Sequence, residues 1–148
     1  MTDYKALSSS LQSLIHGIPH TVANLANASA LLYHTLEDIN WAGFYLAKEN
    51  MLVLGPFQGK VACIEIPFDK GVCGFCASQG KTCRVDNVHK FPGHIACDGA
   101  SNSEIVIPIF KNGALFGVLD IDSPIFSRFT DLDEKGLEEF VRVLEAEL

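Results

Sequence analysis

A cysteine and a histidine occur together with acids and small residues in one short segment, residues 93–104. Cys97 and His94 are its chemically distinctive side chains. Pro92 precedes the segment and disfavours regular structure, whereas the apolar run at residues 105–110 is typical of a buried strand. The sequence therefore predicts a thiol on a loop that leads into a rigid strand, which is a suitable place for chemistry.

The chain contains 5 cysteines, and all of them lie between Cys63 and Cys97. The full set is Cys63, Cys73, Cys76, Cys83 and Cys97. An odd number of cysteines in a chain that is expected to be cytosolic argues against a structural disulfide framework. Each cysteine taken alone is also compatible with a small apolar residue in the core.

Two chemistries could use these thiols. A zinc site would draw its ligands from Cys73, Cys76, Cys83, His89, His94 and Cys97. The single C-x-x-C pair falls inside an expected helix, however, and no second pair at finger-like spacing completes a tetrahedral set. A redox site needs a nucleophilic thiol, a second thiol within reach and a proton donor, and the chain contains all three kinds of group.

Acids interrupt two expected strands and provide candidate proton donors. Glu104 opens one strand of an expected hairpin, while Asp120 and Asp122 lie near the end of its partner. Strand pairing would bring the three carboxyl groups to one end of the sheet. Crowded carboxylates raise one another's pKa, so one could act as a general acid while the others hold a cation. Acids exposed on the surface are the alternative interpretation.

Length, composition and charge restrict the class of protein. With 148 residues, of which 48% are hydrophobic and 20% charged, the chain is expected to form a single domain over residues 1–148. The net charge of −7 argues against a nucleic-acid partner. The beginning of the chain has polar residues and no long apolar run, so neither a leader nor a membrane anchor is expected, and the cytoplasm is the expected location.

Hydrophobic periodicity predicts an α+β domain with a central antiparallel sheet between N-terminal and C-terminal helices. Expected helices lie at residues 4–16, 22–39 and 71–80, with a last helix starting at Thr130, and expected strands at 41–47, 51–55, 61–66, 82–85, 104–110 and 114–122. In the third strand, Cys63 and Glu65 would share one face. Free N–H groups at the start of the 71–80 helix would lower the pKa of the Cys73 thiol.

The sequence closely resembles the free methionine-(R)-sulfoxide reductases, a catalytic branch of the GAF domain fold, over essentially its whole length. The motifs that carry the resemblance are Trp41-Ala42-Gly43-Phe44-Tyr45, Gly71-Val72-Cys73-Gly74, the run from Val88 to Asp98 with its Gly-His-Ile-Ala-Cys-Asp end, Ser101-x-Ser103-Glu104-Ile105-Val106, and residues 117–123. A non-catalytic GAF module would share only the pattern of helices and strands, whereas the Gly-His-Ile-Ala-Cys-Asp run is characteristic of the reductases.

This resemblance implies a role for each matching thiol. Cys97 corresponds to the cysteine that attacks the sulfoxide sulfur, Cys63 to the resolving cysteine, and Cys73 to a third cysteine near the pocket. Cys76 and Cys83 depart from the family pattern, and we interpret them as a helix core residue and a strand residue. They leave open the route by which the disulfide forms.

The resemblance also implies a substrate site. Glu104, Asp120 and Asp122 correspond to carboxylates that hold the substrate ammonium and help to protonate the departing oxygen. Trp41 and Tyr45 correspond to an aromatic wall around the substrate methyl group.

The expected activity is reduction of free L-methionine (R)-sulfoxide through a sulfenic acid and a disulfide, with thioredoxin as electron donor and without a metal or organic cofactor. A homodimer is a further possible assembly. The alternative is a non-catalytic GAF sensor that binds a small ligand in the same pocket and dimerises through its N-terminal helices.

Overall fold

The structure is a computed structural model that describes residues 1–93 and 99–148. The helices are α1 (Tyr4–Ile15), α2 (Thr21–Thr35), α3 (Gly71–Gln79) and α4 (Asp131–Glu145), with a 3-10 turn η1 (Val88–Lys90). The strands are β1 (Trp41–Lys48), β2 (Met51–Gly59), β3 (Glu65–Pro67), β4 (Cys83–Val85), β5 (Ser103–Lys111) and β6 (Ala114–Ser123). None of the helices in these ranges combines the length and apolarity needed to cross a membrane.

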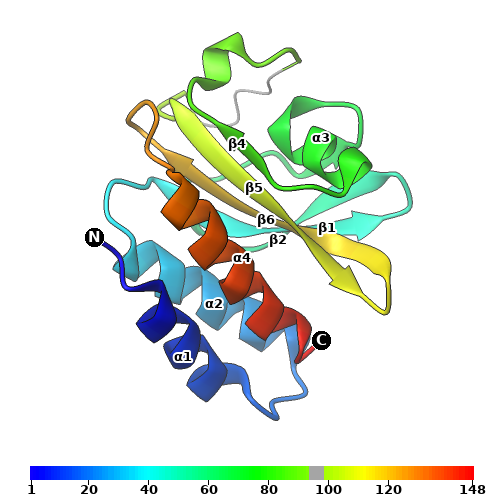
Figure 1. The fold of residues 1–148 in the computed structure, drawn as a ribbon. Coiled ribbons are helices and arrows are strands. Elements are labelled where there is room, and N and C mark those ends of the chain that lie inside the picture. The colour runs from blue at the N-terminus through cyan, green and yellow to red at the C-terminus, as the bar shows by residue number, and fades with distance from the viewer. Residues whose placement is uncertain (94–98) are drawn as a thin grey trace.

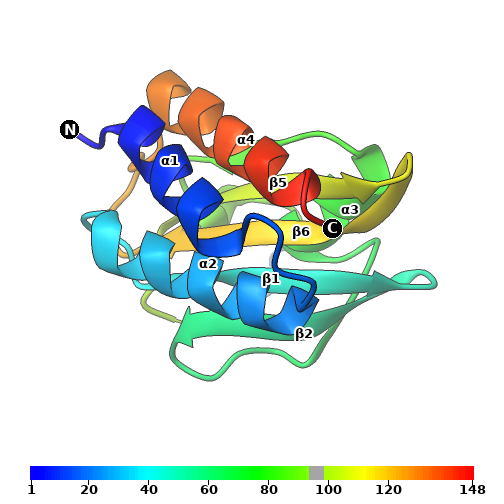
Figure 2. The same cartoon turned by 90° about the horizontal axis from the view of Figure 1, so that it is seen from below.

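The strands form one antiparallel sheet in the order β3-β2-β1-β6-β5-β4. Helices α1, α2 and α4 cover one face of this sheet, and α3 covers the opposite face (Figures 1 and 2). This arrangement confirms the predicted α+β class with a central antiparallel sheet. The order of the strands places β1, β6 and β5 side by side. These three strands carry all of the predicted site residues other than the cysteines.

Alternation along the strands divides the interior into two cores. Under α1, α2 and α4, the buried strand residues include Ala42, Phe44, Ile105, Ile107, Leu119 and Ile121. Under α3, the buried residues are Trp41, Tyr45, Leu52, Ile66, Val72, Cys73, Cys76, Ala77, Val106 and Val118. The first core stabilises the fold, and the second surrounds the predicted site.

Local sequence signals account for several boundaries. Thr130 caps the start of α4. Its side chain accepts a hydrogen bond from the backbone N–H of Asp133, and the Asp133 side chain accepts one from the backbone N–H of Thr130. Helix α3 ends at Gly80, which has a φ of 64° in the left-handed region that glycine adopts readily. The β5–β6 hairpin turns through Asn112 and Gly113, with φ values of 53° and 79°.

The predicted third strand is wrong over most of its length. Strand β3 covers Glu65–Pro67 and pairs with residues 51–53 of β2, so Cys63 lies in the loop that precedes it. The apolar alternation at residues 61–66 had suggested a longer strand. In the structure, Val61 and Ile64 are 87% and 69% exposed, and the carbonyl group of Cys63 accepts a hydrogen bond from the Tyr45 side chain.

Candidate active site

The three predicted acids lie on one face of the sheet because of the strand register. Trp41 of β1 is paired with Asp122 of β6, which in turn is paired with Glu104 of β5. Asp120 lies two residues before Asp122 and therefore points to the same face, one row further along. The structure thus brings together Glu104, Asp120 and Asp122, which we call the carboxylate cluster.

Helix α3 covers the carboxylate cluster and adds a thiol to it. Glu104 and Asp120 are 7% and 5% exposed, and Asp122 is half-buried. The Cys73 thiol of α3 donates a hydrogen bond to Glu104 Oε2 at 3.8 Å. Gly74 permits close packing of α3 against the end of β3, since a Cβ there would lie 2.4 Å from the Pro67 carbonyl oxygen.

Burial among like charges favours the protonated form of Glu104. Desolvation raises the pKa of Glu104 well above its ordinary value, and the charges of Asp120 and Asp122, together with hydrogen bonds to both, raise it further. The protonated form of a carboxyl group is the one that can deliver a proton to a reacting atom. The direction of this shift is therefore the one that a general acid requires.

The expectation of a lowered pKa for Cys73 is wrong. Burial raises the pKa of this thiol well above its ordinary value, and the nearby Asp120, Glu104 and Asp122 add to the shift. Partial positive charge at the start of α3 favours a thiolate, but complete burial beside acids disfavours it more strongly. Cys73 consequently stays a neutral thiol and a hydrogen-bond donor.

Two aromatic residues of β1 border the cluster. Trp41 and Tyr45 are each 2% exposed, and their rings are stacked with centroids 5.9 Å apart. Phe57 of β2 continues the stack, 5.1 Å from Trp41. Phe57 was not among the predicted site residues, because the expected strand ended at residue 55, whereas β2 continues to Gly59 and pairs Phe57 with Gly43. Together the three rings form an apolar wall next to the acids.

The polar ends of these aromatic residues reach the loop that carries Cys63. Trp41 Nε1 donates to the carbonyl oxygen of Lys60 at 3.0 Å, and the Tyr45 hydroxyl donates to the carbonyl oxygen of Cys63 at 2.9 Å. Cys63 is half-buried and is disulfide-bonded. This loop therefore lies next to the carboxylate cluster although it does not belong to the sheet.

The remaining cysteines are divided between the described and the undescribed part of the chain. Cys73, Cys76 and Cys83 carry free thiols. Cys76 is buried, and its thiol donates to the carbonyl oxygen of Val106 at 3.6 Å, in agreement with its interpretation as a core residue. Cys83 lies in β4 as expected. Cys97, the predicted nucleophile, lies outside the described residues.

The described side chains do not assemble the zinc set considered above. Within residues 1–93 and 99–148, the ligand atoms of Cys73, Glu104 and Asp120 lie within 4.8 Å of one another, and Cys76, Cys83 and His89 do not join this group. His89 is exposed, and its Nε2 lies 2.8 Å from the Asn102 side-chain oxygen. The zinc interpretation therefore gains no support from this part of the chain.

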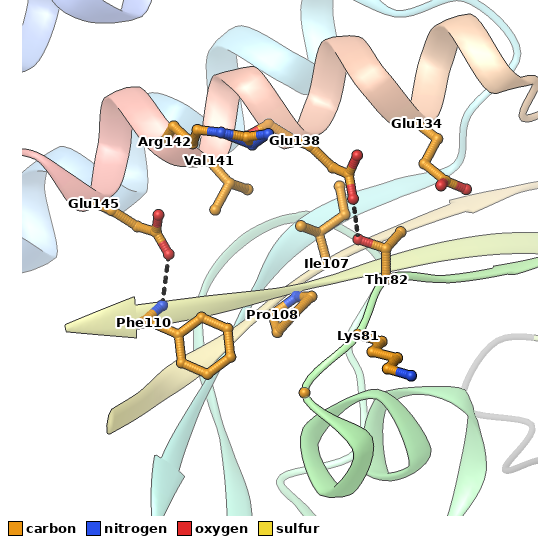
Figure 3. A pocket seen from close by; sticks show the side chains of 11 residues that line it. Lys81, Thr82, Ile107, Pro108, Phe110, Glu134, Glu138, Val141, Arg142 and Glu145 are labelled. Atoms are coloured by element: carbon orange, nitrogen blue, oxygen red, sulfur yellow. Dashed lines mark hydrogen bonds between the residues drawn. The ribbon is translucent and has the colours of Figure 1, made fainter. Parts of the chain in front are cut away.

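A separate hollow of about 500 Å³ lies between α4 and the end of β5 (Figure 3). Glu138 accepts a hydrogen bond from the Thr82 hydroxyl at 2.7 Å, and Glu145 accepts one from the backbone N–H of Phe110 at 2.7 Å. Both acids point from α4 toward the sheet in the figure. None of the predicted site residues lines this hollow, and its third acid, Glu134, forms an ion pair with Arg84 at 3.6 Å, so we do not assign the chemistry to it.

Known proteins share both the sequence and this architecture. The GAF domain family matches residues 10–148. A free methionine-R-sulfoxide reductase of Escherichia coli is 54% identical over 142 residues, which are 96% of this chain and 86% of the relative. The structure of fRMsr of Staphylococcus aureus in its reduced form has a TM-score of 0.97 at 52% identity, over 100% of this chain and 96% of that one.

A third relative was solved with its substrate present. The free methionine-R-sulfoxide reductase of Neisseria meningitidis, in complex with its substrate, has a TM-score of 0.93 at 41% identity, over 97% of this chain and 87% of that one. Identity at this level across almost the whole chain extends well beyond a shared fold. The chain therefore belongs to the GAF domain family and, within it, to the free methionine-R-sulfoxide reductases.

Proposed function

We propose that this protein reduces free L-methionine (R)-sulfoxide to L-methionine. The observation that carries the proposal is the buried carboxylate cluster beside the wall of Trp41, Tyr45 and Phe57. Buried like charges are tolerable when a cation compensates them, and the ammonium group of a free amino acid is such a cation. The aromatic wall suits the apolar methylthio end of the same molecule. Relatives that act on this substrate match nearly the whole chain.

In the first step, the thiolate of Cys97 attacks the sulfur of the sulfoxide. The bond between the substrate sulfur and its oxygen breaks, a sulfur–oxygen bond forms on Cys97, and Glu104 supplies the proton that the oxygen takes up. Methionine leaves, and Cys97 becomes a sulfenic acid. The protonated state of Glu104, which follows from its burial among acids, supports its role as the proton donor.

In the second step, the thiol of Cys63 attacks the sulfenic sulfur of Cys97. A disulfide forms, and the oxygen leaves as water with the thiol proton. The disulfide-bonded state of Cys63, beside free thiols at Cys73, Cys76 and Cys83, supports this pairing. Thioredoxin then exchanges its dithiol with the disulfide and returns both cysteines to the reduced state. Cys73 remains a neutral thiol that donates to Glu104 in the pocket.

The test is a thioredoxin-coupled assay that follows NADPH oxidation with free methionine sulfoxide as substrate. We expect turnover with the (R) epimer and none with the (S) epimer, with Cys83→Ser as a matched control for loss of a cysteine. Binding of the sulfoxide without any methionine formed would favour the alternative, a non-catalytic GAF sensor.

We also propose that residues 1–148 act as one catalytic domain in the cytoplasm, where thioredoxin is available. A homodimer is compatible with this proposal. Size-exclusion chromatography with light scattering, run on oxidised and reduced protein, would determine the oligomeric state.

A further inference from the structure

The loop between β2 and β3 is held through its backbone. Trp41 Nε1 donates to the carbonyl of Lys60, the Tyr45 hydroxyl donates to the carbonyl of Cys63, and the backbone N–H of Leu54 donates to the carbonyl of Ile64 at 2.9 Å. Two of these three donors are side chains of β1. The position of Cys63 therefore depends on the two aromatic residues together with the single backbone hydrogen bond from β2 to the adjacent Ile64.

The side chains of the loop are divided between solvent and the core under α3. Val61 is 87% exposed and Ile64 is 69% exposed, so neither packs into this core. Ala62 and Cys63 are partly buried against it, and Cys63 is also held by its disulfide bond. Before the disulfide forms, this covalent anchor is absent, so each hydrogen bond to the backbone of the loop has a larger share in fixing it.

The two donors are themselves rigid. Trp41 and Tyr45 are buried in the middle of the sheet, stacked on each other, and fixed by pairing of β1 with β2 and β6. Burial, followed by the charges of Asp120, Cys73, Asp122 and Glu104, raises the pKa of Tyr45, so its hydroxyl remains a donor throughout the physiological range. The hydroxyl of Tyr45 is thus a permanent donor at a fixed place.

We propose that Tyr45 is a positioning residue for the resolving step, because its hydroxyl holds the backbone of Cys63, which is disulfide-bonded in the structure. The inference rests on the proposed function and adds a role for Tyr45 beyond that of a wall for the substrate. The step that it assists forms the bond between Cys63 and the sulfenic sulfur of Cys97 and releases the sulfenic oxygen as water. Fixing one reactant raises its effective concentration at the other.

The test compares Tyr45→Phe with Tyr33→Phe. The first variant keeps the ring and removes the hydroxyl that contacts Cys63, and the second removes a hydroxyl from α2, away from the site. In a single turnover without reductant, methionine formation measures the first step. The lifetime of the sulfenic acid, followed by dimedone trapping, measures the second. We expect Tyr45→Phe to prolong this lifetime about fivefold, the effect of losing one ordinary hydrogen bond. We expect Tyr33→Phe to behave as the unchanged protein.

A second readout does not require the reductase activity. Wild-type and variant proteins are equilibrated in dithiothreitol redox buffers, and the fraction of Cys63 in a disulfide is measured by alkylation and mass spectrometry. A freer loop should shift this equilibrium about fivefold toward the dithiol in Tyr45→Phe. If the wild-type protein makes no methionine while the equilibrium shifts as expected, the proposed function fails and the positioning role stands. Equal sulfenic acid lifetimes and equal thiol equilibria in Tyr45→Phe and Tyr33→Phe would overturn the positioning role.

Discussion

The free energy of unfolding of the wild-type protein should fall as the pH rises, and replacing Glu104 with glutamine should make this fall smaller. Burial and the neighbouring Asp120 and Asp122 raise the pKa of Glu104 in the folded state, whereas the unfolded chain exposes this group to water. Between the unfolded and the folded pKa, the native state therefore holds a proton that the unfolded state has released. Stability falls with pH across that interval, since the slope follows the difference in bound protons.

The size of the effect follows from the number of protons. One proton held only by the folded state corresponds to a loss of about 1.4 kcal/mol in the free energy of unfolding for each pH unit. Glutamine has nearly the same shape as the protonated carboxyl group but cannot titrate. Glu104→Gln should therefore match the wild type near the unfolded pKa of about 4.3 and become progressively more stable than the wild type above it.

The measurement is urea denaturation at several values between about pH 5 and pH 8, with the cysteines kept in one redox state. Glu65→Gln is the matched control, because Glu65 is exposed on β3. Its denaturation curves should follow those of the wild type. Parallel pH dependences for the wild type and Glu104→Gln would refute the conclusion that Glu104 retains a proton because it is buried among acids.

Other consequences concern the thiols, the substrate and the packing of the sheet. Cys97→Ser should abolish reduction in the thioredoxin-coupled assay, because a hydroxyl cannot replace the thiolate as nucleophile. Cys63→Ser should still give about one methionine per enzyme in a single turnover, yet recycle poorly with thioredoxin; near-normal recycling would assign resolution to another thiol. N-acetylated methionine (R)-sulfoxide lacks the ammonium group, so its kcat/KM should fall about a thousandfold, given a cost of roughly 3–5 kcal/mol for uncompensated buried charge. Gly43→Ala should lower the free energy of unfolding by about 1–3 kcal/mol in urea titrations, because its Cβ would lie 2.2 Å from Phe57 Cβ.

Regular alternation and turn chemistry made most of the sheet predictable. The β5–β6 hairpin was expected over residues 104–110 and 114–122, and Asn112 and Gly113 of the connection between them both adopt positive φ. The register of that hairpin brings Glu104 opposite Asp122. The sequence predicted that the three acids lie towards one end of the sheet, whereas their exact pairing is known only from the structure.

Two expectations failed where a local pattern competes with contacts from distant residues. The alternation at residues 61–66 is compatible with a strand, but the carbonyls of Lys60 and Cys63 accept hydrogen bonds from Trp41 and Tyr45, which are about twenty residues away in the sequence. No local signal reveals such partners. The position of Cys73 at the start of α3 likewise predicts a lowered thiol pKa. In the structure, buried acids of the sheet lie against this thiol and raise its pKa instead.

Both failures lie at the candidate active site, and this has a physical reason. A segment that only supports the fold can follow its local preferences, because its packing and hydrogen bonding then agree with them. In the proposed mechanism, the resolving cysteine Cys63 must instead reach another thiol, and the proton donor Glu104 must stay neutral although an exposed acid would ionise. These requirements are met by contacts between residues far apart in the sequence, which override the secondary-structure and ionisation preferences of the local sequence. The loop at Cys63 and the carboxylate cluster both differ in this way from what their local sequence predicts. The core under α1, α2 and α4, on the other face of the sheet, only supports the fold and is not subject to these requirements.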